Sequence, residues 1–170
     1  MIDTSHLTDV QVLACTLWGE ARSLPTEEIL QVACVVRNRV NTDWGHDTKP
    51  DWWGEGYRGV CLKPKQFSCW NPDPAVSEPR KFKTNHDRVV ELVAALKSGT
   101  VTDERYKECA WIATGVINDW VRDVVHGADH YHTSAMTPRP AWARDRVPLN
   151  NLFPPKAGHV FYRLAPRPAA

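Results

Sequence analysis

Four stretches of the 170-residue sequence place apolar residues three and four positions apart, and this repeat constrains the fold more than any other feature. Such spacing is typical of helices that bury one face. The stretches cover residues 8–22, 25–40, 85–98 and 103–119. Residues 159–162 favour a short strand or a packed terminal segment. We therefore expect a mainly α-helical, compact domain with little β-structure.

The helix ends are signalled by residues that satisfy free backbone groups. Thr8 and Gln11 have the spacing of a capping box before the first helix. Pro25 suits the first turn of the second helix. Asn85 is expected to cap the third helix, and Gly99 to stop it. These signals place the four helices along the chain.

The segments between the helices are expected to be long, ordered loops. From residue 41 to 79, Gly, Pro, Trp and Asp replace the helical pattern. After Trp120 several prolines interrupt the chain, which again predicts loops. The length suits one domain over residues 1–170, with loose termini at 1–6 and 164–170.

Composition narrows the class of partner. The net charge of +1 argues against a strongly electrostatic nucleic-acid binder. Eight tryptophans are a high count, and those in loops suit stacking on sugar rings as well as packing of a small core. The sequence shows no apolar run of membrane-spanning length, so we expect no stable membrane insertion.

The cysteines and the N-terminus bear on the compartment. An odd total of five cysteines favours synthesis in a reducing compartment. Cys61 and Cys69 bracket a turn-rich stretch and would be able to form a disulfide if oxidised. The first residues lack the pattern of a signal peptide. We expect synthesis in the cytoplasm.

Glu20 is the candidate catalytic residue. It ends the first apolar helix within Trp18-Gly19-Glu20-Ala21-Arg22. Loss of hydration and the negative end of a helix dipole both disfavour an ionised carboxyl group, which suits it for donating a proton. The alternative is a helix-end acid paired with Arg22, Arg37 or Arg39.

Residues 66–71 form the second candidate cluster. The stretch mixes hydrogen-bonding groups with aromatic rings, a combination able to line a sugar-binding cleft. We single out Gln66, Phe67 and Ser68 as substrate contacts. The alternative is a buried turn whose polar atoms bond the local backbone.

The segment 126–132 carries three histidines and one aspartate, which suggests either a zinc site or the wall of a cleft. In a strand, His130 and His132 share one face, and Tyr131 points the other way. The sequence has no HExxH motif, and we favour Tyr131 and His132 as substrate contacts, with no metal or other cofactor. A nucleophilic Cys69 is disfavoured, because no basic residue lies near it in the sequence.

Five blocks of the sequence resemble the spore-cortex-lytic (SleB-like) family of bacterial cell wall hydrolases, which also occurs among phage lysis proteins. The blocks, in the order that the family shows, are Leu17–Arg22, Gln31–Val40, Val60–Trp70, Gly127–His132 and Gly158–Arg163. Together they span most of the chain.

This resemblance implies a lysozyme-like helical domain that cleaves peptidoglycan glycan strands between N-acetylmuramic acid and N-acetylglucosamine. It assigns the catalytic acid to Glu20, and lytic transglycosylation as the reaction. The absence of a signal peptide and of a wall-binding repeat fits a phage or prophage endolysin, a monomer that acts on the wall after release.

Three other functions stay open at this point. A second carboxylate about 5–9 Å from Glu20 would make the protein a hydrolytic muramidase. Zinc on the histidine cluster would make it a wall peptidase or amidase. The tryptophans alone would make it a non-catalytic carbohydrate-binding module. The candidate second carboxylates are Asp43, Asp47, Asp51, Glu55, Asp73 and Asp129.

Overall fold

The computed structural model describes residues 2–42, 53–72, 82–149 and 158–164. Its elements are α1 (Asp9–Ala21), α2 (Thr26–Val40), α3 (Gly56–Leu62), the 3-10 helix η1 (Ser68–Trp70), α4 (Asn85–Ser98), α5 (Glu104–Ile117), β1 (His130–Thr133), the 3-10 helix η2 (Ala141–Ala143) and β2 (His159–Tyr162). The predicted mainly α-helical fold with little β-structure is confirmed. Within these residues, no helix has the length and apolar character needed to cross a membrane.

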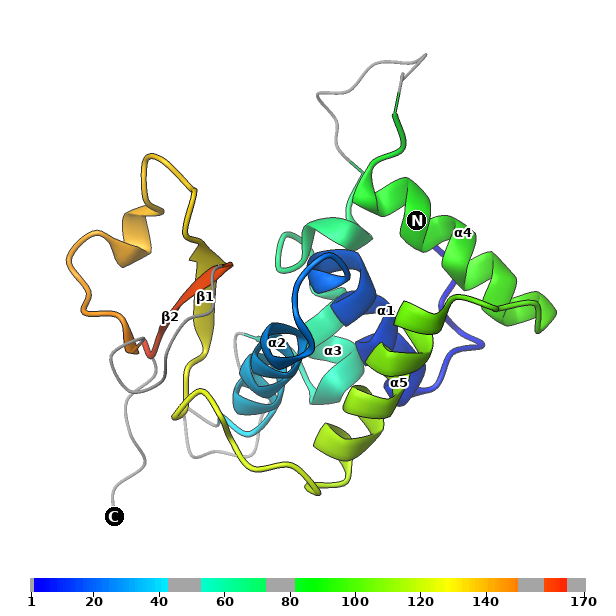
Figure 1. The fold of residues 1–170 in the computed structure, drawn as a ribbon, viewed down its shortest axis with the longest axis horizontal. Coiled ribbons are helices and arrows are strands. Elements are labelled where there is room, and N and C mark those ends of the chain that lie inside the picture. Colours follow the sequence, from blue (N-terminus) through cyan, green and yellow to red (C-terminus); the bar gives the residue numbers. More distant parts are fainter. Residues whose placement is uncertain (1, 43–52, 73–81, 150–157, 165–170) are drawn as a thin grey trace.

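Helix α1 lies at the centre of the helical assembly (Figure 1) and contacts α2, α3, α4, α5 and η1. Its predicted capping box is present, since Thr8 and Gln11 each bond the other's backbone N–H. The sequence predicted one buried face, but every residue from Val12 to Gly19 is buried. The partners on all sides of α1 account for this difference.

The predicted bounds of α2, α4 and α5 are confirmed to within two residues. One predicted cap is wrong, because Thr84 and not Asn85 caps α4. Thr84 Oγ1 accepts a hydrogen bond from the Asp87 N–H at 3.2 Å, and the Asp87 carboxylate accepts one from the Thr84 N–H at 2.8 Å. Gly99 ends the helix with a φ of 69°, as predicted.

Helix α3 lies where the sequence predicted a loop. With seven residues it is too short to show an apolar repeat, and its two glycines weaken the helical signal. Val60 and Cys61 are buried, and the helix packs against α1 and α2. Trp44 and Trp52 lie outside the described residues.

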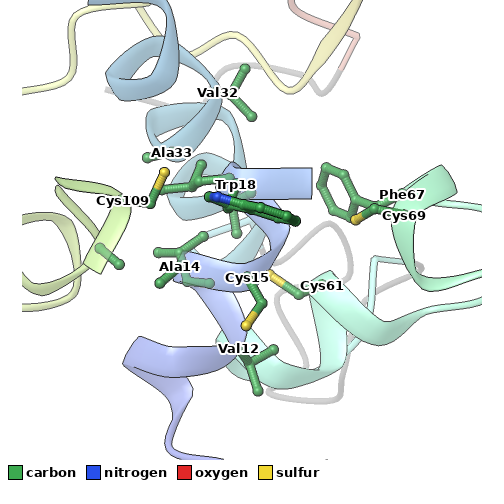
Figure 2. Close-up of a cluster of buried hydrophobic side chains, with 14 of the residues drawn as sticks. Val12, Ala14, Cys15, Trp18, Val32, Ala33, Cys61, Phe67, Cys69 and Cys109 are labelled. Atoms are coloured by element: carbon green, nitrogen blue, oxygen red, sulfur yellow. The ribbon is translucent and has the colours of Figure 1, made fainter. Parts of the chain in front are cut away.

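The core is held by packing without cross-links among the cysteines. All five cysteines are free and buried, so the Cys61–Cys69 disulfide that the sequence left open is not formed. Burial raises the pKa of the Cys15 and Cys61 thiols to about 12. Figure 2 shows these two side chains next to each other, and Trp18 lying across the core above them.

The two strands form an antiparallel pair beside α2 (Figure 1), with His130 opposite Tyr162 and Tyr131 opposite Phe161. Phe161 packs into a small cluster with Cys34 and Val35 of α2. The strand predicted at residues 159–162 is confirmed as β2. Strand β1 falls in a region where the sequence predicted loops, although its alternating faces were anticipated.

A buried acid anchors β2 to α2. The carboxylate of Glu28 accepts a hydrogen bond from the Gly158 N–H at 3.1 Å, and its other oxygen lies 3.5 Å from His159 Nδ1. Glu28 and His159 are 2% and 5% exposed. Burial first, and the neighbouring His132 second, lower the pKa of His159 from 6.5 to about 4.

We expect this histidine to make folding sensitive to acid. Between pH 6.5 and 4 the unfolded chain protonates His159 while the folded chain leaves it neutral, so the stability present above pH 6.5 is lost as the pH falls. The loss amounts to at most about 3 kcal/mol, because each pH unit between the two pKa values of His159 corresponds to about 1.4 kcal/mol. Urea unfolding at pH 7, 5.5 and 4.5 measures it. His159→Gln should reduce the change of unfolding free energy with pH, and the control His6→Gln, at an exposed histidine, should not. An equal pH dependence in the parent protein and both variants would contradict the assignment.

Candidate active site

Glu20 lies in the last turn of α1, half-buried, with one carboxyl oxygen held in place. Its Oε1 accepts a hydrogen bond from Ser68 Oγ at 3.1 Å and another from the Cys69 N–H at 3.0 Å. Among the described residues, Oε2 has no hydrogen-bond partner. The carboxyl group is thus oriented through one oxygen while the other is available to carry and deliver a proton.

The arginines that offered an alternative role for Glu20 are bonded elsewhere. Arg22 donates to the Trp18 and Gly19 carbonyls at 3.3 Å. Arg37 donates to the Val121 carbonyl, and Arg39 to the Asp129 carbonyl. In the part of the chain that the structure describes, none of the three forms an ion pair with Glu20.

Gly19 allows η1 to approach the end of α1. A Cβ atom at this position would lie 2.5 Å from Cys69 Cβ and 2.8 Å from its Sγ, closer than packed side chains tolerate. A second contact holds η1 nearby, because the Trp70 indole N–H donates to Thr16 Oγ1 at 2.9 Å. The small residue before Glu20 therefore brings the donors of η1 within reach of the carboxylate.

Arg39, which the sequence offered only as an ion-pair partner for Glu20, is a buried arginine that holds the neighbouring part of the site. Arg39 is 6% exposed and donates to the Asp129 carbonyl at 2.7 Å and to Gln66 Oε1 at 3.1 Å. Its guanidinium also lies over the rings of Trp53 and Phe67, at 4.7 and 5.4 Å from their centroids. Arg39 thereby joins α2, the residue that precedes β1 and the 66–71 segment.

Of the predicted contacts in residues 66–71, the structure brings Ser68 onto Glu20 and Gln66 onto Arg39. Phe67 is 1% exposed and packs beneath Arg39, so its ring presents no surface to a ligand in this structure. The roles of Gln66, Phe67 and Ser68 as substrate contacts stay predictions.

Tyr131 lies close enough to Glu20 and Arg39 for the charges of both to affect the pKa of its phenol. Burial raises the pKa of Tyr131 well above its usual value, and the Glu20 carboxylate raises it further, while the Arg39 guanidinium opposes the shift. The phenol is therefore protonated at neutral pH and able to donate a hydrogen bond near the Glu20 carboxyl group.

His132 faces the opposite side of the sheet from Tyr131, as the strand pattern predicted. Its ring stacks on Tyr162, with centroids 5.6 Å apart, and lies edge-on to Trp142. His130 packs between Trp53 and Trp142. Among the described residues, no three His, Cys, Asp or Glu side chains converge in a metal-binding cluster. The predicted contact between His132 and substrate is untested.

Comparison with protein families shows to which family the chain belongs. The model of the Cell Wall Hydrolase family matches residues 24–162, which is most of the sequence. The chain belongs to this family. Neither the curated proteins nor the solved structures gave a match.

Membership of the cell wall hydrolase family supports an enzyme that acts on peptidoglycan. The matched stretch contains Ser68, Cys69 and Tyr131 but begins four residues after Glu20. The geometry of Glu20 therefore supports its assignment independently of the match. The phage or prophage origin stays a prediction.

For a cell wall hydrolase, the position of any second carboxylate affects the reaction. Asp129 is 1% exposed, and its Oδ1 bonds His130 Nδ1 and the Leu164 N–H, each at 2.8 Å. Glu55 is exposed at the start of α3. The other candidates in the 41–79 segment lie outside the described residues.

The remaining candidate, a nucleophilic Cys69, lacks the chemistry that a nucleophile needs. Burial raises the pKa of its thiol well above the usual value, and the adjacent Glu20 carboxylate raises it further. The thiolate is the reactive form of cysteine, so Cys69 is not activated as a nucleophile here, and its backbone N–H bonds the Glu20 carboxylate.

Proposed function

We propose that the protein is a lytic transglycosylase that cleaves peptidoglycan between N-acetylmuramic acid and N-acetylglucosamine, with Glu20 as the single acid and base. The observation that carries the proposal is the carboxyl geometry. Glu20 is half-buried, bonded at Oε1 by Ser68 and Cys69, and without an arginine partner among the described residues. These are the properties of a positioned proton donor.

In the first step, Glu20 gives its proton to the glycosidic oxygen as the bond from that oxygen to muramyl C1 breaks. The carboxylate that remains then accepts the proton of the muramyl 6-hydroxyl as O6 bonds to C1. The ring closes as a 1,6-anhydro sugar, Glu20 regains its proton, and no water is consumed. Ser68 and Cys69 hold Oε1 throughout, so Oε2 carries the proton in both steps.

Tyr131 supports this sequence of steps. Its protonated hydroxyl is an uncharged donor that lies within the electrostatic reach of Glu20. A neutral donor at this position orients the substrate or the carboxylate without adding a second negative charge. The Arg39 guanidinium, whose charge also acts on Tyr131, holds Gln66 through its Oε1.

Mass spectrometry of the soluble products from purified cell walls, digested in water enriched in ¹⁸O, tests the reaction. Transglycosylation predicts 1,6-anhydromuramyl ends that carry no ¹⁸O. Reducing muramyl ends with one ¹⁸O would indicate hydrolysis with a second carboxylate. Intact glycan with cut peptides would overturn the proposal.

A further inference from the structure

A pocket of about 360 Å³ lies between η1 and the first turn of α4. Ser68 belongs to its wall and also donates to Glu20, so the pocket borders the catalytic carboxyl group. Its volume is in the range of small-molecule sites. The residues that line it are Ser68, Asn71, Pro72, Thr84, Asn85 and His86.

Most of the described residues in the wall of this pocket carry hydrogen-bonding side chains, and none of these described residues is Asp, Glu, Lys or Arg. Hydroxyl groups come from Ser68 and Thr84, amides from Asn71 and Asn85, and an imidazole from His86. Such a lining suits an uncharged ligand with several hydrogen-bonding groups. A charged peptide end would find no opposite charge among the described lining residues themselves.

His86 presents a hydrogen-bond acceptor to the pocket. Its Nδ1 lies 3.3 Å from the Cys69 carbonyl oxygen. Because a carbonyl oxygen only accepts, this contact assigns the proton to Nδ1 and leaves a lone pair on Nε2 of the neutral ring. Among the described residues, Nε2 has no partner. The backbone of Cys69 thus joins His86 on one side to Glu20 on the other.

Asn85 supplies the complementary donor. Its Oδ1 accepts a hydrogen bond from Arg22 Nη2 at 2.8 Å, which assigns the oxygen and leaves the amide N–H groups without a partner among the described residues. An acceptor on His86 and a donor on Asn85 match the N–H and C=O of an acetamido group.

We propose that this pocket is a subsite for an N-acetylated sugar ring of the glycan strand, with His86 Nε2 as the acceptor for the acetamido N–H. This inference rests on the proposed function and names the residues that select the sugar. It makes His86 a specificity-determining residue.

The test is binding of a β-1,4-linked N-acetylglucosamine trimer to the Glu20→Gln protein, measured by calorimetry or by NMR titration. In this background, His86→Asn keeps a donor for the Cys69 carbonyl but removes the acceptor at Nε2. We expect His86→Asn to weaken binding by about tenfold, the effect of one lost hydrogen bond. Cellotriose, which has a hydroxyl in place of the acetamido group, should bind weakly and equally to both proteins.

Unchanged affinity for the trimer on adding His86→Asn to the Glu20→Gln protein would overturn the proposed subsite. Failure of the trimer to bind the Glu20→Gln protein itself would overturn it too. His126→Ala, at an exposed histidine outside the pocket, is the matched control and should bind as the parent does. Because binding is measured without cleavage, this result is independent of the product analysis that tests the proposed reaction.

Discussion

Glu20→Gln is expected to lower the rate of cell wall lysis by roughly 100- to 10,000-fold, the range of general acid catalysis. This corresponds to about 3–5 kcal/mol in the activation barrier. The glutamine amide has no proton to give the glycosidic oxygen. Its carbonyl oxygen still accepts from Ser68 and Cys69, so the fold and the melting temperature should be unchanged. Release of soluble muropeptides from purified walls measures the rate.

Glu91→Gln is the matched control for this substitution. Glu91 is an exposed acid on α4 that pairs with Lys83, and removing its charge leaves the catalytic carboxyl untouched. Lysis by this variant should equal that of the parent. Near-parental lysis by Glu20→Gln, with a folded protein, would remove Glu20 from the mechanism.

Gly19→Ala is expected to damage both stability and activity. Alanine normally favours a helix over glycine by up to about 1 kcal/mol. Here the added Cβ would lie 2.5 Å from Cys69 Cβ and 3.0 Å from Val89 Cγ2, so η1 must move. Overpacking of this kind costs about 1–3 kcal/mol, or roughly 2–12 °C in Tm. Displaced donors would misplace Glu20 and lower kcat on the order of 100-fold.

Gly115→Ala is the corresponding control, in the buried face of α5. Among the described residues, a Cβ atom there meets Val121 Cγ2 alone, at 3.0 Å, so activity should persist. The double variant Gly19→Ala with Cys69→Gly removes the clashing Cβ and should recover part of the lost activity. Full activity of Gly19→Ala alone would show that close contact with η1 is dispensable.

Local sequence signals predicted the long helices well because their stripes and caps lie within a few residues of one another. Thr8 with Gln11, and Gly99, are examples. Helix α3 and strand β1 were not predicted because both are stabilised by segments far away in the sequence. His130–Thr133 becomes a strand by pairing with β2, about thirty residues away along the chain.

For the site, Glu20 and Ser68 were found from their residue types and surroundings, and the structure brings them together. Arg39 was considered only as an ion-pair partner of Glu20, because its burial depends on Trp53, Phe67 and the Asp129 carbonyl, which are distant in the sequence. Gly19 was named only as a neighbour of Glu20, since the closeness of Cys69 leaves no trace in the local sequence. Contacts between distant segments account for both omissions.

The enclosure of α1 by its neighbours has a consequence for how the enzyme fails on heating. Helix α1, whose last turn carries Glu20, touches α2, α3, α4, α5 and η1, so it opens only when the whole assembly comes apart. Thermal inactivation should then coincide with global melting, with no inactive but folded state preceding it. The temperature at which this enzyme loses activity is then set by how tightly the surrounding helices pack against α1.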